Sequence, residues 1–571
     1  MKNIVSSLLS LFFCTAVWAQ ERTYTRSMDR VGSMDPIEGI SLYAARAIKL
    51  QYETLLEYDY VARPYRLIPG LAEALPEVDA TGCIYTFRIR RTAQFHPDPC
   101  FGVDAAGKLR GRAVTAHDVV YSLKRLVDRR LPTAGAWIVE DKILGLKAFA
   151  EASGRGAATA YAQPVEGLRA VDDQTVQIVL TEPLYTFPFC MTMACTAIVP
   201  REAVERYAAD FGQHPVGSGP YQLTAWRRNH QMTFSRVAAW PGWQEGPAAF
   251  TAHDDRVPFD TVIYRNIEDV STQWICFLAG ELDFLGEVSR DNWDAVIDPS
   301  GGITADLQAR GITLHALAAL EVAYIGFNMD DPVVGPNKKL RQALNCAFNG
   351  QAWERFYNNR VEAANGAVPR CVMGYSDQPF PYSYNLELAK KLLVEAGYPE
   401  GLDPKTGRRL VLTLDLGRAS QDMRETVELL TAFYAKIGVQ LQAQYHNWPV
   451  FLKRVSERRS QLFRIGWVGD YSDPENFMMT FYGKNVSPGA NRVNYVNPAF
   501  DAVFEQAIRE PDSGRRAAHW AAAQAIVRED CPWVFLHFPK AYSLCHRRVL
   551  NYSPTDFVDG TEKYLRCLRK K

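Results

Sequence analysis

The strongest constraint on the fold is a regular alternation of two periodicities between residues 410 and 468. Segments that alternate apolar and polar side chains, as half-buried strands do, are separated by segments with apolar side chains at helical spacing. The expected order is a strand at Leu410–Leu416, a helix at Gln421–Ile437, a strand at Val439–Tyr445, a basic helix at Val450–Ser460 and a strand at Gln461–Val468. This order predicts an open α/β sheet, in which ligands gather beyond the carboxyl ends of the strands.

Three carboxylates and a tryptophan follow this last strand, in the stretch GWVGDYSDPENF at residues 466–477. Asp473 before Pro474 predicts a helix N-cap followed by proline in the first turn, and Glu475 would favour the positive end of the helix dipole. A calcium loop is excluded because the residues after Asp470 do not supply oxygen ligands at the required spacing. On pattern alone, Asp470 either closes an Asx turn or binds a ligand.

Catalytic and metal-binding motifs are absent from the sequence. There is no H-E-x-x-H, no Walker A loop and no G-x-S-x-G, since Gly217-Ser218-Gly219 has the wrong spacing. The ten histidines are scattered without ligand-like spacing, and no Cys-x-x-Cys occurs. We therefore predict no catalytic residues, no metal site and no cofactor, and we expect a protein that is not an enzyme.

Charge and the N-terminal segment bear on partners and compartment. The 64 basic and 64 acidic residues cancel, which removes the electrostatic argument for nucleic-acid binding. Lys2 precedes an apolar run at residues 4–17, and Ala19 completes a signal-peptidase site, so cleavage after Ala19 is expected. Phe13 before Cys14 does not fit lipoprotein processing. No later segment reaches the length needed to span a bilayer, so we expect a soluble, exported product.

At 571 residues, 47% of them hydrophobic, the chain is too long for one core, and two or three lobes are expected. Ten of its eleven cysteines follow the leader, so disulfides are plausible in an oxidising compartment, but their pairing cannot be deduced.

In the first third of the chain, residues 84–91 alternate apolar and polar side chains like a strand, and Thr115 with Asp118 predicts a capping box at the start of a helix. Residues 97–112 are rich in proline, glycine and charge and predict a loop.

Ten segments spread over nearly the whole mature chain occur in the order typical of one known family. In sequence and order they resemble family 5 of the extracellular solute-binding proteins of ABC importers, the oligopeptide- and dipeptide-binding proteins. The segments, besides GWVGDYSDPENF, are SMDP (33–36), YETLLEYD (52–59), PGLAEALPEVDATGCIYTFRIRRTAQFH (69–96), TAHDVVYSLKRLVD (115–128), HPVGSGPYQLTAW (214–226), AGELDF (279–284), YIGFNMDDP (324–332), KLRQALNCAFN (339–349) and NLELAKKLLVEAGYPEG (385–401). Each is weak alone, and their shared order makes the resemblance specific. Residues 97–112 depart from the family pattern as an insertion.

The resemblance implies an α/β, bilobal, periplasmic-binding-protein-like type II fold with an accessory third subdomain. After a signal peptide at 1–19, one lobe would combine residues 20–60, 185–266 and 537–571, with the accessory subdomain at 61–184. The second lobe would be 267–536. Closure of the two lobes would trap a ligand between them.

The resemblance also implies ligand-binding residues. In the family's peptide binders the aspartate of this stretch holds the α-ammonium of the peptide, which maps onto Asp470, and the tryptophan maps onto Trp467 as a pocket wall. Such an assignment is physically reasonable because an unpaired buried charge is costly and a charge-assisted hydrogen bond is strong. Arg464 lies near where some members hold the peptide carboxylate, and a solvated arginine at a strand end is the alternative.

The expected function is therefore that of a periplasmic substrate-binding component of an ABC importer. It would capture short peptides in the cleft and deliver them to a membrane permease, acting as a monomer. One alternative is the same fold with another solute, such as a nickel chelate, haem or an oligosaccharide. The other is a secreted hydrolase that uses Asp470 and a distant acid.

Overall fold

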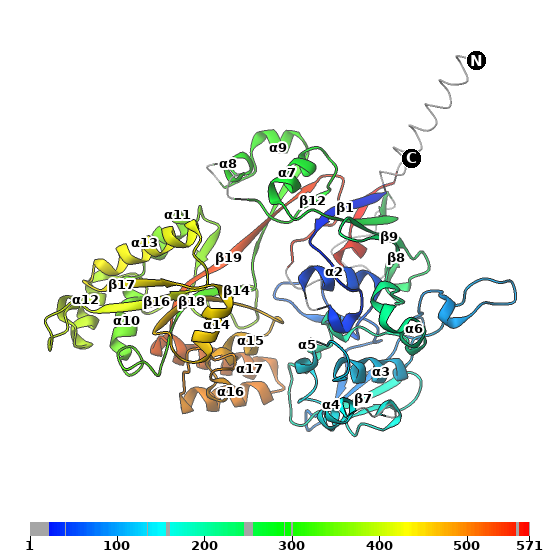
Figure 1. Cartoon of the computed structure of the whole chain (residues 1–571), viewed down its shortest axis with the longest axis horizontal. Helices are drawn as coiled ribbons and strands as arrows, with labels where there is room; N and C mark the ends of the chain where they lie inside the picture. The colour runs from blue at the N-terminus through cyan, green and yellow to red at the C-terminus, as the bar shows by residue number, and fades with distance from the viewer. Residues whose placement is uncertain are drawn as a thin grey trace, which may run out of the picture. The chain divides into compact units, whose positions relative to one another are not determined.

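The computed structural model describes residues 22–39, 41–133, 135–155, 160–244, 255–289, 292–298, 301–555 and 559–569. The chain forms two compact units (Figure 1). Unit 1 comprises Met1–Leu317 and Tyr542–Lys571, and unit 2 is the continuous segment Ala318–Ala541. Each unit is described by itself below.

Unit 2 is built on one mixed sheet in the order β17-β16-β18-β14-β19, with β15 paired to β19. Its strands are β14 (Glu321–Phe327), β15 (Val361–Ala363), β16 (Val411–Leu416), β17 (Gln440–Tyr445), β18 (Leu462–Val468) and the start of β19 (Trp533–His546). Strand β16 is parallel to both β17 and β18, whereas β14 is antiparallel to β18 and β19. The open α/β sheet expected from the alternation is confirmed.

The helices of unit 2 cover this sheet around one apolar core. They are α10 (Lys338–Ala347), α11 (Gly350–Phe356), α12 (Leu386–Glu395), α13 (Gln421–Ala435), α14 (Trp448–Ser456), α15 (Pro474–Met478), α16 (Pro498–Arg509) and α17 (Ser513–Asp530). Leu412 and Leu414 of β16 pack in this core with Phe433 of α13. Helix α14 begins two residues earlier than expected, because the Asn447 side chain accepts a hydrogen bond from the Val450 N–H and caps it.

The largest sheet part of unit 1 has the order β12-β1-β11-β9-β8, and the end of β19 pairs with β12. Separate sheets join β4-β5-β7-β6, β2-β3 and β10-β20. The strands are β1 (Thr23–Met28), β2 (Leu56–Tyr58), β3 (Leu67–Pro69), β4 (Glu77–Val78), β5 (Ile84–Arg88), β6 (Leu168–Ala170), β7 (Thr175–Val179), β8 (Tyr221–Arg227), β9 (Gln231–Arg236), β10 (Arg256–Pro258), β11 (Thr261–Asn266), β12 (Phe284–Leu285), β13 (Ile312–Ala318) and β20 (Arg566–Leu568).

One helix of unit 1, α3 (Ala116–Leu126), begins with the predicted capping box. The helices of this unit are α2 (Leu42–Gln51), α3, α4 (Leu146–Gly154), α5 (Phe187–Cys190), α6 (Arg201–Tyr207), α7 (Val270–Leu278), α8 (Trp293–Val296) and α9 (Ala305–Ala309). Thr115 and Asp118 cap α3 reciprocally. The insertion at 97–112 contains a short 3-10 turn, Pro99–Phe101, and an isolated antiparallel bridge between Val103 and Leu109. A side chain on Gly217 would strike the carbonyl of Gln51, so this glycine permits a close approach of two backbone segments.

Contacts group residues 267–317 with unit 1 and residues 537–541 with unit 2. The assignment of lobes at 20–60, 61–184, 185–266, 267–536 and 537–571 is not tested by this grouping and stays a prediction. No disulfide joins the ten cysteines in the described ranges, six of which are buried, so the plausible disulfides do not occur there. Among the helices of the described residues, none is long and apolar enough to cross a membrane.

Candidate functional site

Strand β18 carries two of the three residues predicted to bind ligand and leads to the third. In the ladder, Arg464 lies opposite Ile325 of β14 and Leu416 of β16, so it sits at the level where β16 ends. Trp467 lies opposite Val322, near the other end of β18. Asp470 follows the strand by two residues and lies six residues beyond Arg464, a path of at most about 20 Å if fully extended.

A buried amide joins Trp467 to Asp470. The Oδ1 atom of Asn476 accepts hydrogen bonds from Trp467 Nε1 at 3.2 Å and from the Asp470 backbone N–H at 2.9 Å. The Nδ2 atom of Asn476 donates to Asp470 Oδ2 at 3.2 Å. Because Asn476 is fully buried in α15, these three bonds fix the indole and the carboxylate relative to each other. Asn476 was not predicted as part of the site; its place in the first turn of the predicted helix was the only sign of it.

The Asp470 carboxylate has no counter-charge. No basic side chain within the described parts of the chain comes within ion-pair distance of it, and Asn476 provides its one side-chain hydrogen bond. The carboxylate is exposed to solvent, yet surrounding protein atoms remove part of its hydration. This burial raises the pKa of Asp470, and the bond from Asn476 opposes the shift. A cation placed beside Asp470 would offset the free-energy cost of holding this partly dehydrated carboxylate in its ionised form.

The other two acids of the stretch have structural roles, as predicted for helix capping. Asp473 precedes α15 and accepts a hydrogen bond from the Glu475 N–H at 3.0 Å. Asp473 is completely buried and forms an ion pair with Arg516 of α17, which the sequence did not reveal. Glu475 accepts a hydrogen bond from the Tyr471 hydroxyl. These contacts hold α15, and therefore Asn476, in place.

Arg464 is a half-buried cation without an acidic partner among the described residues. Its Nη1 atom lies 3.9 Å from the sulfur of Met423 in α13, and its buried Nε atom has no hydrogen-bond acceptor. Burial, with the positive charge of Arg464, lowers the pKa of His537 to about 3. His537 is therefore neutral, and its Nδ1 atom accepts a hydrogen bond of 2.9 Å from Trp353 Nε1. Arg464 is thus available for an anionic group of a ligand.

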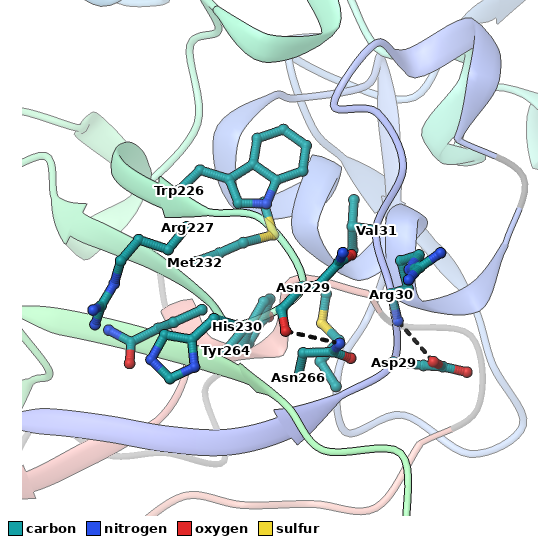
Figure 2. A pocket seen from close by; sticks show the side chains of 12 residues that line it. Asp29, Arg30, Val31, Trp226, Arg227, Asn229, His230, Met232, Tyr264 and Asn266 are labelled. Atoms are coloured by element: carbon teal, nitrogen blue, oxygen red, sulfur yellow. Dashed lines mark hydrogen bonds between the residues drawn. The ribbon is translucent and has the colours of Figure 1, made fainter.

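Unit 1 contains a separate small hollow of about 20 Å³ at the carboxyl ends of the parallel strands β1 and β11 (Figure 2). Its lining combines the apolar side chains of Met28, Val31 and Met232 with the Trp226 indole. Asn266 Nδ2 donates to the Asn229 carbonyl at 3.3 Å across its floor, drawn as a dashed line in Figure 2. None of the three predicted ligand-binding residues contributes to this hollow.

The model of the bacterial extracellular solute-binding proteins, family 5, matches residues 66–489. The chain belongs to this family. Heme-binding protein A of Haemophilus influenzae is 26% identical over 530 residues, covering 91% of this chain and 87% of that protein. The dipeptide-binding protein of Escherichia coli is 25% identical over 519 residues, with coverages of 89% and 87%. The segments that carried the resemblance therefore identified the family correctly.

Solved structures of family members show the same fold. HbpA2 from Haemophilus parasuis matches with a TM-score of 0.78 at 24% identity, covering 96% of this chain and all of that one. The unliganded murein tripeptide-binding protein MppA matches with a TM-score of 0.76 at 22% identity, covering 96% of this chain and 98% of that one. The α/β, bilobal type II fold expected from the sequence is confirmed. Members of this family are periplasmic proteins that bind solutes. The predicted signal peptide at 1–19 lies outside the described residues.

Proposed function

We propose that this family 5 protein captures short peptides and delivers them to the permease of an ABC importer. The observation that carries the proposal is the Asp470 carboxylate, which is partly desolvated, lacks a counter-charge among the described residues and is oriented beside Trp467 by Asn476. The α-ammonium of a peptide supplies the missing charge and several hydrogen-bond donors. Relatives described as dipeptide- and di/tripeptide-binding proteins support the same ligand class.

Arg464 would bind the opposite end of the ligand, the carboxylate of the peptide. Its guanidinium has no acidic neighbour in the described structure, and a peptide carboxylate would pair with it through two parallel hydrogen bonds. Asp470 and Arg464 are separated along one strand and the turn that follows it. A short zwitterionic peptide would offer one charged end to each residue, while its side chains would contribute less to affinity.

The test compares free and N-acetylated forms of one peptide by calorimetry. Asp470→Asn should weaken binding of the free peptide by about 1–2 kcal/mol or more, roughly tenfold in affinity, because the neutral amide cannot pair with the ammonium. The matched control is Asp377→Asn, which removes an acid that is 80% exposed in the same unit. Equal affinities of the wild type for free and N-acetylated peptide would contradict the role of Asp470.

A second candidate is the same fold with another solute, such as haem, a nickel chelate or an oligosaccharide. It is favoured by the likeness to Heme-binding protein A and to HbpA2. Haem carries two carboxylates, and either of them could pair with Arg464. Native mass spectrometry of the purified protein separates the candidates, because a single haem, chelate or sugar mass differs from a ladder of peptide masses.

We further propose that the protein binds its ligand without chemical change, as a monomer, after export and cleavage behind Ala19. Peptide recovered intact after long incubation supports binding alone, whereas turnover would favour the hydrolase alternative. Light scattering reports the oligomeric state. The intact mass of the exported product shows whether residues 1–19 are removed and whether Cys14 carries a lipid.

A further inference from the structure

Unit 1 contains a second polar cavity, of about 50 Å³, that lies in a different unit from Asp470. It is formed where the C-terminal segment meets β2 and β3 and the segment after β5. Its charged lining residues are Glu53, Glu57, Arg90, Lys563 and Arg566, and its other walls include Trp240 and Tyr564. No residue of the GWVGDYSDPENF stretch takes part in it.

Both acids of this cavity already have cationic partners. Arg90 Nη2 donates to Glu53 Oε1 at 2.6 Å, and the exposed fraction of Glu53 is only 2%. Lys563 forms a buried ion pair with Glu57, and the charge of Lys563 holds the pKa of Glu57 down at about 2 against the effect of burial. Glu57 is therefore ionised and neutralised by its partner. Burial raises the pKa of Glu53, and the charge of Arg90 opposes this shift. With both acids ionised, the two pairs leave no net charge on this part of the lining.

Arg566 is the remaining charge, and it has no acidic partner among the residues that the structure describes. Its Nη1 atom donates to the carbonyls of Lys563 at 2.7 Å and Leu565 at 2.9 Å. These bonds hold the guanidinium at the cavity wall, and among the described residues none accepts a hydrogen bond from Nε or Nη2. Arg236, a further cation near Arg566, is already paired with Asp260 at 3.0 Å. The cavity therefore has a surplus of one positive charge on an oriented donor.

We propose that this cavity is a binding site for a small oxyanion, held by Arg566 and flanked by Lys563 and Arg90. An arginine fork presents two parallel N–H groups to two oxygens of a phosphate, sulfate or carboxylate, which gives both strength and orientation. The anion would neutralise the one uncompensated charge in the lining and link β20 to the rest of the cavity. The site is independent of the peptide proposal, since it shares no residue with it.

The experiment measures thermal stabilisation and calorimetric affinity of the full chain with two probes, inorganic phosphate and glycerol 3-phosphate. Sodium chloride at matched ionic strength provides the baseline. Binding of inorganic phosphate indicates a free anion as the natural occupant, and binding of glycerol 3-phosphate alone indicates a phosphoryl group on a larger molecule. Either result supports the oxyanion site. No stabilisation beyond the chloride baseline by either probe overturns it.

Variants locate the site. Arg566→Gln should weaken binding of the effective probe at least tenfold, and Arg566→Lys, which keeps the charge without the fork, should weaken it about threefold. The matched control Arg206→Gln alters an exposed arginine of α6 and should leave probe affinity unchanged. Circular dichroism and the melting temperature of each variant without probe serve as the check of folding. If Arg566→Gln fails to fold, Arg566→Lys decides, and wild-type affinity in a folded variant at Arg566 refutes the assignment.

Discussion

At the scale of the residue, Asp470 combines an exposed carboxylate with a raised pKa and a fixed orientation. Its position was predictable because the motif places an acid just past a strand end. Its partner Asn476 was not, because three hydrogen bonds depend on how α15 turns back toward β18. Arg464 was predictable as a cation near the sheet edge, but its lack of an acidic neighbour is a tertiary property that no spacing reveals.

Peptide affinity should depend on pH through Asp470. Only the ionised carboxylate pairs with an ammonium, and burial places the unliganded pKa above its ordinary value. Affinity should therefore be full at neutral pH and fall as the pH drops through this raised pKa, approaching tenfold per pH unit below it. Calorimetry between pH 4 and 7 measures the profile. The affinity of Asp470→Asn for peptide should be nearly independent of pH over this range. If its affinity falls with pH as steeply as that of the wild type, another group is responsible for the titration.

Asn476 should act as a positioning residue. Asn476→Ala removes three hydrogen bonds from a fully buried site and should cost about 2 kcal/mol of stability and roughly tenfold in peptide affinity. Asn476→Asp keeps an acceptor for Trp467 but places a second carboxyl beside Asp470. It should move the pH midpoint of peptide binding upward, because like charges disfavour ionisation. A midpoint that stays in place in a folded Asn476→Asp protein would indicate that Asn476 only supports the fold.

At the scale of the element, the alternation of strands and helices in 410–468 was sufficient to predict β16, α13, β17, α14 and β18, since each has a clear periodicity. The sheet order was not predictable in the same way. Strand β14 lies between β18 and β19, which is more than two hundred residues away in sequence from β14. Only tertiary packing determines that neighbour. The cap of α15 was readable from Asp473-Pro474, but its burial against α17 was not.

The ion pair between Asp473 and Arg516 should be a major support of α15. Arg516→Met leaves the fully buried Asp473 carboxylate without its counter-charge and should lower the free energy of unfolding by about 3–5 kcal/mol. The adjacent Arg515→Met removes an exposed pair with Glu510 and should cost less than about 1 kcal/mol. Denaturant unfolding of both variants checks the difference. Equal losses would show that the buried pair contributes no more than a surface pair.

At the scale of the whole molecule, Asp470→Asn should change the stability of the unliganded protein and its affinity for peptide in opposite directions. The folded-state pKa of Asp470 lies above its unfolded value, so the stability that this group contributes is lost as pH rises through the folded pKa. Asp470→Asn should therefore raise the unliganded melting temperature at neutral pH.

The same variant should keep only about half of the stabilisation that peptide gives the wild type, which is about 2.7 kcal/mol at a ligand concentration of 100 Kd, because a tenfold weaker affinity removes about 1.4 kcal/mol of it. Scanning calorimetry with and without peptide measures both effects. A lower unliganded melting temperature for Asp470→Asn would show that the carboxylate supports the fold instead of straining it.

Strand β19 has residues 533–541 in unit 2 and residues 542–546 in unit 1. Unit 2 is therefore an uninterrupted stretch nested within the sequence of unit 1. During synthesis from the N-terminus, all of unit 2 has been made before the strand end that pairs with β12, the strand β20 that pairs with β10, and Lys563, which neutralises Glu57. The unit that begins the chain must wait for its last thirty residues, whereas unit 2 has all of its residues before those thirty are made.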